Sequence, residues 1–298
     1  MCGGALLACT LSAALLLASY SQETASAKRT RSLSPSAFEP ASSAATAATL
    51  FAVHLRTPHF CLASTRDLAL ADLGEVAEHA YAVAYELLCI EDLPGGDRAL
   101  PILICRDVEE LRTVEQQHGV TVDVRRESLP GGFYPTVPMI AILNSRRTVE
   151  LVAHEVGHWA IAQVIEHCPR VVDEGLAEYI ESLVLEARED CVNDAHAVRG
   201  KRRKILTYVA RANKIPPLAQ MFEPDRFRSY AIENYALAWC LMSVACEHER
   251  RHPGTLRKLL ERLAVEKGEP WKVVAALYPA TWLEKRWRER VMEAAAGE

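Results

Sequence analysis

Two histidines and a glutamate could bind a metal ion and use it to activate water. The segment reads His154-Glu155-Val156-Gly157-His158, and it lies within residues 148–167, whose apolar periodicity predicts a helix. Residues four apart on a helix leave the same face, so both imidazoles can reach one Zn²⁺. Glu155 lies on the neighbouring flank, where it can take a proton from the activated water. The alternative is an ordinary helix with two unrelated histidines.

A second, acidic cluster follows after a short connection. The segment 172–179 reads VDEGLAEY and opens a helix predicted over residues 173–189. A catalytic zinc site takes three protein ligands, and two histidines with one glutamate are an established set. Fifteen residues separate His158 from Glu174, which leaves room for a turn at Pro169 and an antiparallel return. We expect Glu178 to accept the distal N–H of a liganding histidine. The alternative for both glutamates is a solvated acidic face.

In the first half of the chain the predicted strands and helices alternate, and the second half is predicted to contain helices alone. Such an order predicts an α+β fold, with a small sheet beside a helical lobe. We expect Gly175 to let the second metal-site helix press closely against the first. A turn is predicted at residues 129–132. The predicted strands are 58–64, 100–105 and 139–143, and the predicted helices are 68–90, 107–118, 148–167, 173–189, 201–212, 230–251, 256–266 and 271–295, the last broken at Pro279.

The N-terminal segment predicts export. Residues 2–20 carry no charge, and Ala25-Ser26-Ala27 before Lys28 fits a signal-peptide cleavage site, so 1–27 is predicted to be a signal peptide. No Lys or Arg precedes the apolar core, so the alternative is an uncleaved membrane anchor. Residues 28–49, rich in Ser, Ala and Thr, are predicted to form a disordered linker. The domain then covers 50–298, with a sheet-containing half at 50–167 and a helical half at 168–298. We expect a periplasmic, cell-envelope or secreted protein, with membrane contact only through the N-terminus.

Composition excludes several other classes. The 298 residues are 50% hydrophobic and 24% charged, as in globular proteins, and the net charge of −5 argues against a nucleic-acid partner. Seven cysteines follow the signal without C-x-x-C spacing, which favours buried thiols and leaves any disulfide unassigned. The basic run Lys201-Arg202-Arg203-Lys204 is predicted to be a solvated helix start, the alternative being a surface for an anionic partner.

The two metal-site motifs resemble those of gluzincin-type metallopeptidases, especially the peptidase-MA-like (DUF1570) family of exported bacterial proteins. That family carries H-E-x-x-H, then P-x-W-x-x-E-G-x-A-E-Y, then Y-x-x-x-W-x-L. This chain has the second motif at 169–179, with Val171 in place of Trp, and the third at 235–241. The resemblance covers roughly residues 55–290. It implies a zincin-like fold, with one zinc ion per chain held by His154, His158 and Glu174.

The resemblance also implies a mechanism, in which Glu155 acts as the general base for hydrolysis of a peptide bond. A tyrosine or histidine from a later helix often stabilises the oxyanion in related gluzincins, so Tyr235 is the first candidate and Tyr230 the second. Either tyrosine has the alternative of being an ordinary core residue. Strand 139–143 would be the sheet edge to which a peptide substrate adds.

Two other functions remain open from the sequence. One is a non-catalytic binding or scaffold protein with structural zinc, against which Glu155 argues, since such a site needs no base. The other is a zinc hydrolase of a non-peptide amide or ester, such as a cell-wall linkage. The G-x-M-E-N box of aminopeptidases is absent from the sequence, which favours an endopeptidase over an aminopeptidase.

Overall fold

The computed structural model describes residues 51, 53–65, 68–90, 99–120, 130–188, 191–227, 231–266 and 268–297. The predicted signal peptide at 1–27, the predicted linker at 28–49 and Tyr230 lie outside these residues. Within them, no helix has both the length and the apolar character that a membrane crossing requires. No disulfide forms among the seven described cysteines, and four of these are buried.

Five strands form one mixed sheet in the order β1-β2-β3-β5-β4. The three central strands pair in parallel, and an antiparallel strand closes each edge. Strands β3 and β5 read as the continuous apolar runs LPILIC and MIAIL, as expected for strands covered by helices on both faces. The strands are β1 (Val53–Arg56), β2 (Phe60–Ser64), β3 (Leu100–Cys105), β4 (Gly131–Tyr134) and β5 (Met139–Leu143).

The sheet edge on this side is β4, so the expectation that 139–143 forms the edge is wrong. Strand β5 lies between β3 and β4. Residues 131 and 132, predicted to lie in a turn, instead begin β4. Gly131 has a φ of +126°, and a Cβ there would lie 2.1 Å from the carbonyl oxygen of Ala141. Gly131, one of the two glycines that indicated a turn, therefore allows a strand to lie directly against β5.

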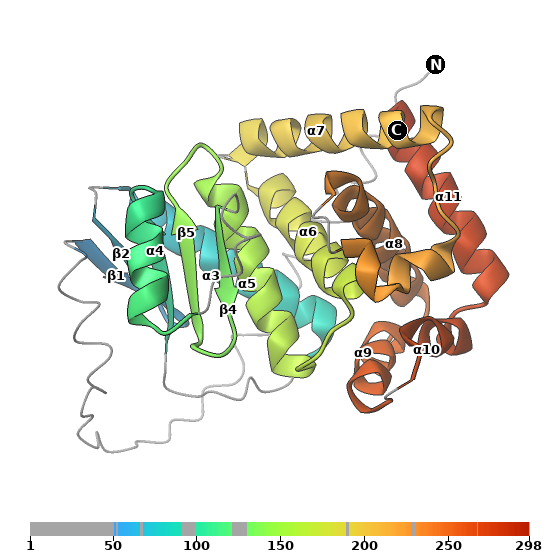
Figure 1. Ribbon diagram of the computed structural model, residues 1–298, viewed down its shortest axis with the longest axis horizontal. Helices are drawn as coiled ribbons and strands as arrows, with labels where there is room; N and C mark the ends of the chain where they lie inside the picture. The colour runs from blue at the N-terminus through green and yellow to red at the C-terminus, as the bar shows by residue number, and fades with distance from the viewer. Residues whose placement is uncertain are drawn as a thin grey trace, which may run out of the picture. The chain divides into compact units, whose positions relative to one another are not determined.

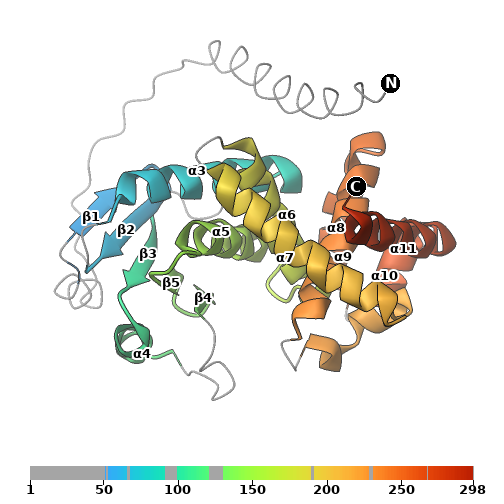
Figure 2. The same cartoon turned by 90° about the horizontal axis from the view of Figure 1, so that it is seen from above.

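Alternate side chains of the central strands face two separate hydrophobic layers, and helices lie on both sides of the sheet (Figure 2). Ile102, Ile104 and Ile140 join the larger core beneath α3 and α5. Leu103 and Ala141 point the other way and pack with α4. Because successive side chains of a strand point to opposite faces, helices can pack on both faces of the sheet. The helices are α3 (Leu70–Leu88), α4 (Val108–Gln117) and α5 (Thr148–Val164).

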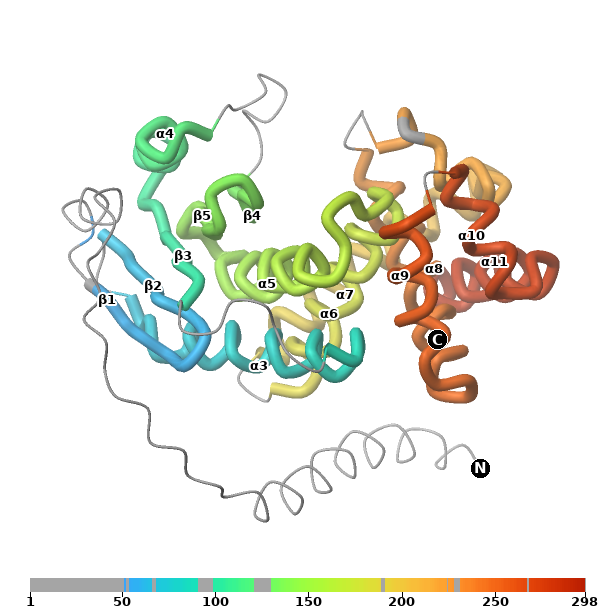
Figure 3. The backbone as a smooth tube through the Cα atoms, turned by 90° about the horizontal axis from the view of Figure 1, so that it is seen from below, coloured from blue at the N-terminus to red at the C-terminus, as the bar shows by residue number. Residues whose placement is uncertain are grey.

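Helices alone follow the sheet in the described chain, and α5 and α6 lie between the strands and the C-terminal helices (Figures 1 and 3). The α+β prediction is confirmed, with five strands and nine α-helices in the described ranges. The remaining helices are α6 (Arg170–Ala187), α7 (Val192–Arg211), α8 (Ile232–Arg251), α9 (Thr255–Val265), α10 (Pro270–Leu277) and α11 (Ala280–Ala296), with 3₁₀ turns at Leu218–Phe222 and Pro224–Phe227.

Helix α6 is pressed between α5 and α8, and a different glycine serves each contact. A Cβ on Gly157 of α5 would lie 3.1 Å from Cα of Ala177. Gly175 faces α8 instead, where a Cβ would lie 2.6 Å from the carbonyl oxygen of Ala238. The expectation that Gly175 serves the α5–α6 contact is therefore wrong, because that glycine lies on the opposite side of α6. The close approach at Gly157 brings the histidine motif of α5 against the acidic motif of α6.

Candidate metal centre

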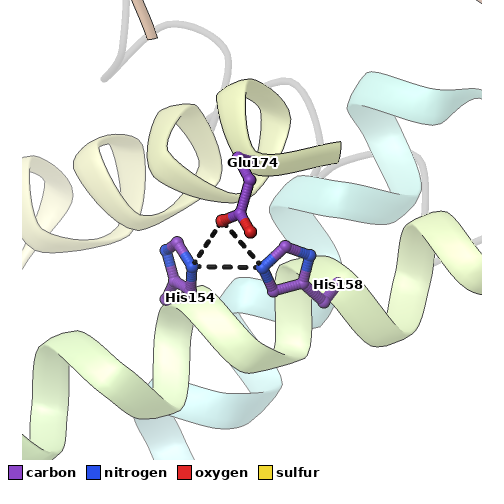
Figure 4. A group of neighbouring side chains, drawn as sticks. All are labelled: His154, His158 and Glu174. Carbon is purple, nitrogen blue, oxygen red and sulfur yellow. Dashed lines mark hydrogen bonds and ion pairs between the residues drawn. The ribbon is translucent and has the colours of Figure 1, made fainter. Parts of the chain in front are cut away.

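Three side chains from α5 and α6 converge on one point (Figure 4). The Nε2 atoms of His154 and His158 are 3.1 Å apart. Oε2 of Glu174 lies 3.5 Å from the first nitrogen and 3.4 Å from the second. Its other oxygen, Oε1, accepts from Arg170 at 2.9 Å, which fixes the carboxylate's orientation. The three residues named from the sequence as metal ligands thus lie together.

This triangle has the dimensions of a zinc site. Three ligand atoms placed tetrahedrally about 2.0–2.1 Å from one Zn²⁺ lie about 3.3–3.4 Å from each other. The three separations in the structure, 3.1, 3.4 and 3.5 Å, bracket that value. Two imidazole nitrogens and one carboxylate oxygen also suit the chemistry of zinc. The residues present therefore fit the ion that the sequence implies.

Each imidazole is oriented from behind by a carboxylate, although not by Glu178. Nδ1 of His158 lies 2.8 Å from Oδ1 of Asp173, and Nδ1 of His154 lies 3.2 Å from Oε2 of Glu181. Such partners present Nε2 to a metal by holding the proton on Nδ1. Glu178 instead accepts from Arg202 at 2.8 Å, so its expected bond to a histidine is wrong. Spacing could have indicated Glu181, because residues 174, 178 and 181 form one helical stripe.

The neighbouring carboxylates favour positive charge at the point where the three ligand side chains meet. Burial alone would lower the pKa of His158, but the charges of Asp173 and Glu174 outweigh burial and raise that pKa to about 10. Burial likewise opposes protonation of His154, whose pKa hydrogen bonds to Glu174 and Glu181 raise well above its usual value. Burial would raise the pKa of Glu174, yet the adjacent His158 lowers it. A divalent cation supplies the positive charge that these groups favour.

Glu155 lies beside the triad and is tied to the sheet edge. The residue is 7% exposed, and its Oε2 accepts a 2.7 Å hydrogen bond from the main-chain N–H of Phe133 in β4. It lines the same pocket as the three ligand residues without belonging to either group of candidate metal ligands. This placement agrees with the predicted role beside the metal.

The triad opens into a pocket of about 610 Å³. Strand β4 contributes Gly131, Gly132 and Phe133, and α5 contributes residues from Leu151 to Ala162. Tyr235 of α8 also lines this pocket, which agrees with its choice as a candidate donor. Its ring packs edge-on to Phe227 at 5.9 Å between centroids. The second candidate, Tyr230, lies outside the described residues.

Arg202 is a part of the centre that sequence reasoning missed. The run 201–204 lies in the middle of α7, which begins at Val192, so the prediction of a solvated helix start is wrong. Arg202 is 6% exposed and pairs with Glu178, whereas Lys201, Arg203 and Lys204 are exposed. The four consecutive charges hid this residue, because a run of basic residues carries no sign that one of them faces inward.

The chain matches no protein-family model and no curated protein sequence. The resemblance to gluzincin-type metallopeptidases therefore stays a prediction from the two motifs.

Proposed function

We propose that this protein is an exported zinc-dependent peptidase of zincin-like fold. The observation that carries the proposal is the triangle of His154, His158 and Glu174, with the Glu155 carboxylate in the same pocket. A structural zinc site is normally closed by four protein ligands, whereas three ligands and an adjacent carboxylate are typical of catalytic sites. The export part of the proposal rests on the predicted signal at residues 1–27.

The three ligand residues would hold one zinc ion per chain. When bound, zinc would act as a Lewis acid and lower the pKa of a water molecule bound to it toward about 7. Glu155 then accepts the proton of the attacking water and returns it to the leaving amine. Tyr235 donates its phenol O–H to the oxyanion that develops on the peptide carbonyl. Asp173 and Glu181 hold the imidazole protons on Nδ1 throughout.

The shape of the pocket favours an extended peptide. Its lining follows α5 from Leu151 to Ala162, past both histidines. The lining stretch of α5 spans about 17 Å at about 1.5 Å per residue, the length of about five residues of extended chain. A peptide that continues on both sides of the triad is the substrate of an endopeptidase. The outer edge of β4, which lines the same pocket, offers main-chain groups for adding such a strand.

Metal content and cleavage together test the proposal. The purified protein should contain about one zinc per chain by inductively coupled plasma mass spectrometry, and His158→Ala should lose it. Glu155→Gln should keep the zinc and lose cleavage of a peptide library. Zinc-free wild-type protein, even after zinc is added back, would refute the proposal. Zinc that stabilises the fold without any cleavage would favour the scaffold alternative, and cleavage confined to non-peptide amides or esters would favour the other hydrolase.

A further inference from the structure

Glu178 and Glu181 form a second group of ligand atoms with His154. The three atoms that these residues offer lie within 4.8 Å of one another. The two groups share the His154 ring, because Nε2 faces Glu174 at 3.5 Å while Nδ1 faces Glu181 at 3.2 Å. One imidazole and two carboxylates are a ligand set that divalent transition metals accept.

A positively charged side chain, that of Arg202, already binds this second group. The Nη2 of Arg202 donates to Oε2 of Glu178 at 2.8 Å. The guanidinium also lies 4.3 Å from the ring centroid of Trp239. That ring donates its N–H to Ser182 at 3.1 Å, and the Ser182 hydroxyl donates to the carbonyl oxygen of Glu178 at 2.8 Å. Arg202 is thus held in place by its ion pair and by an anchored aromatic ring.

We propose that Arg202 restricts the centre to a single metal ion, and that His154, Glu178 and Glu181 bind a second divalent cation once this guanidinium is removed. The inference rests on the proposed zinc centre. The fixed guanidinium binds Oε2 of Glu178 and repels another cation nearby. Arg202 is a positioning residue, since it acts through Glu178.

The restriction protects the geometry of the first site. A cation on Nδ1 of His154 would replace the hydrogen bond between this atom and Oε2 of Glu181. That hydrogen bond orients the ring so that Nε2 faces His158 and Glu174, and losing it would loosen the triad. The buried Arg202 leaves Glu181 free to serve His154 as a hydrogen-bond acceptor.

Zinc stoichiometry of the full chain tests the inference. Wild-type protein and Arg202→Met, which keeps an apolar stem over Trp239, are dialysed against excess zinc chloride, and bound zinc is counted by mass spectrometry. We expect about one zinc in the wild type and about two in Arg202→Met. Arg202→Lys, which keeps the charge, should hold one. Lys204→Met, an exposed position on the same helix, is the matched control and should also hold one.

The location of the extra zinc is tested by the double variant Arg202→Met with Glu178→Gln, which should return to one. One zinc in Arg202→Met, or a second zinc that persists in the double variant, would overturn the inference while leaving the proposed function intact. A wild type without zinc would overturn both. Arg202→Gln replaces Arg202→Met if circular dichroism shows that the latter does not fold.

Discussion

The main-chain N–H of Phe133 donates a 2.7 Å hydrogen bond to the carboxylate of Glu155. This bond joins the edge strand β4 to the flank of the helix that carries both histidines. The Phe133 N–H points away from β5, which pairs with the other side of β4. The proposed base and the proposed strand-adding edge therefore meet at one point, and a substrate strand on β4 would pass directly over Glu155.

The position of β4 depends on Gly131, so Gly131→Ala should damage both fold and activity. A Cβ there would lie 2.1 Å from a carbonyl oxygen of β5, at a φ of +126°. We expect a loss of about 1–3 kcal/mol in the free energy of unfolding, measured by urea denaturation. Gly132→Ala is the control, because its Cβ would meet Glu155 at an ordinary 3.9 Å. Equal unfolding midpoints for the two variants would contradict this account.

The hydrogen bond between Asp173 and His158 should strengthen zinc binding. We expect Asp173→Asn to weaken zinc affinity about 10–100-fold, because the imidazole loses the partner that fixes its proton. Competition with a chromophoric chelator measures this affinity. Glu166→Gln removes an exposed carboxylate that also lines the pocket, and its affinity should stay at the wild-type value. Unchanged zinc affinity in Asp173→Asn would show that this bond does not support the metal.

We expect Tyr235 to affect the rate of peptide cleavage and not the binding of zinc. We expect Tyr235→Phe to lower kcat about 10²–10³-fold, the usual effect of losing one oxyanion donor, with zinc content unchanged. Steady-state kinetics on a cleaved peptide measures the change. Tyr208→Phe, on an exposed tyrosine of α7, should keep the wild-type kcat. A wild-type rate in Tyr235→Phe would assign that ring to packing alone.

Two helical glycines should respond in opposite directions to alanine. At Gly175 a Cβ would lie 2.6 Å from both the Ala238 carbonyl oxygen and the Met242 side chain, so we expect Gly175→Ala to destabilise the fold by about 1–3 kcal/mol. At Gly200 no atom lies within 4 Å, and Gly200→Ala should stabilise α7 by about 0.5–1 kcal/mol. Thermal unfolding followed by circular dichroism distinguishes the two. A higher melting temperature for Gly175→Ala would show that α6 and α8 can separate without cost.

Local patterns in the sequence determined much of the fold and the ligand set. The helical period alone placed His154 and His158 on one face of α5, because residues one turn apart share a side whatever surrounds the helix. Asp107 was correctly identified as the start of α4, where its side chain accepts from the N–H of Glu110. The apolar runs of β3 and β5 likewise identified buried strands, since their composition reflects burial on both faces.

Tertiary packing decided which partners the ligands receive. Glu174, Glu178 and Glu181 share one stripe of α6, so spacing makes both Glu178 and Glu181 candidates for the contact with His154 without choosing between them. That choice follows from the close contact of α5 and α6 at Gly157, and from the buried Arg202 that binds Glu178 from α7. The edge position of β4 has the same origin, because strand order depends on pairing between distant segments. Helical period is a property of neighbouring residues, whereas these relationships join residues that only the folded chain brings together.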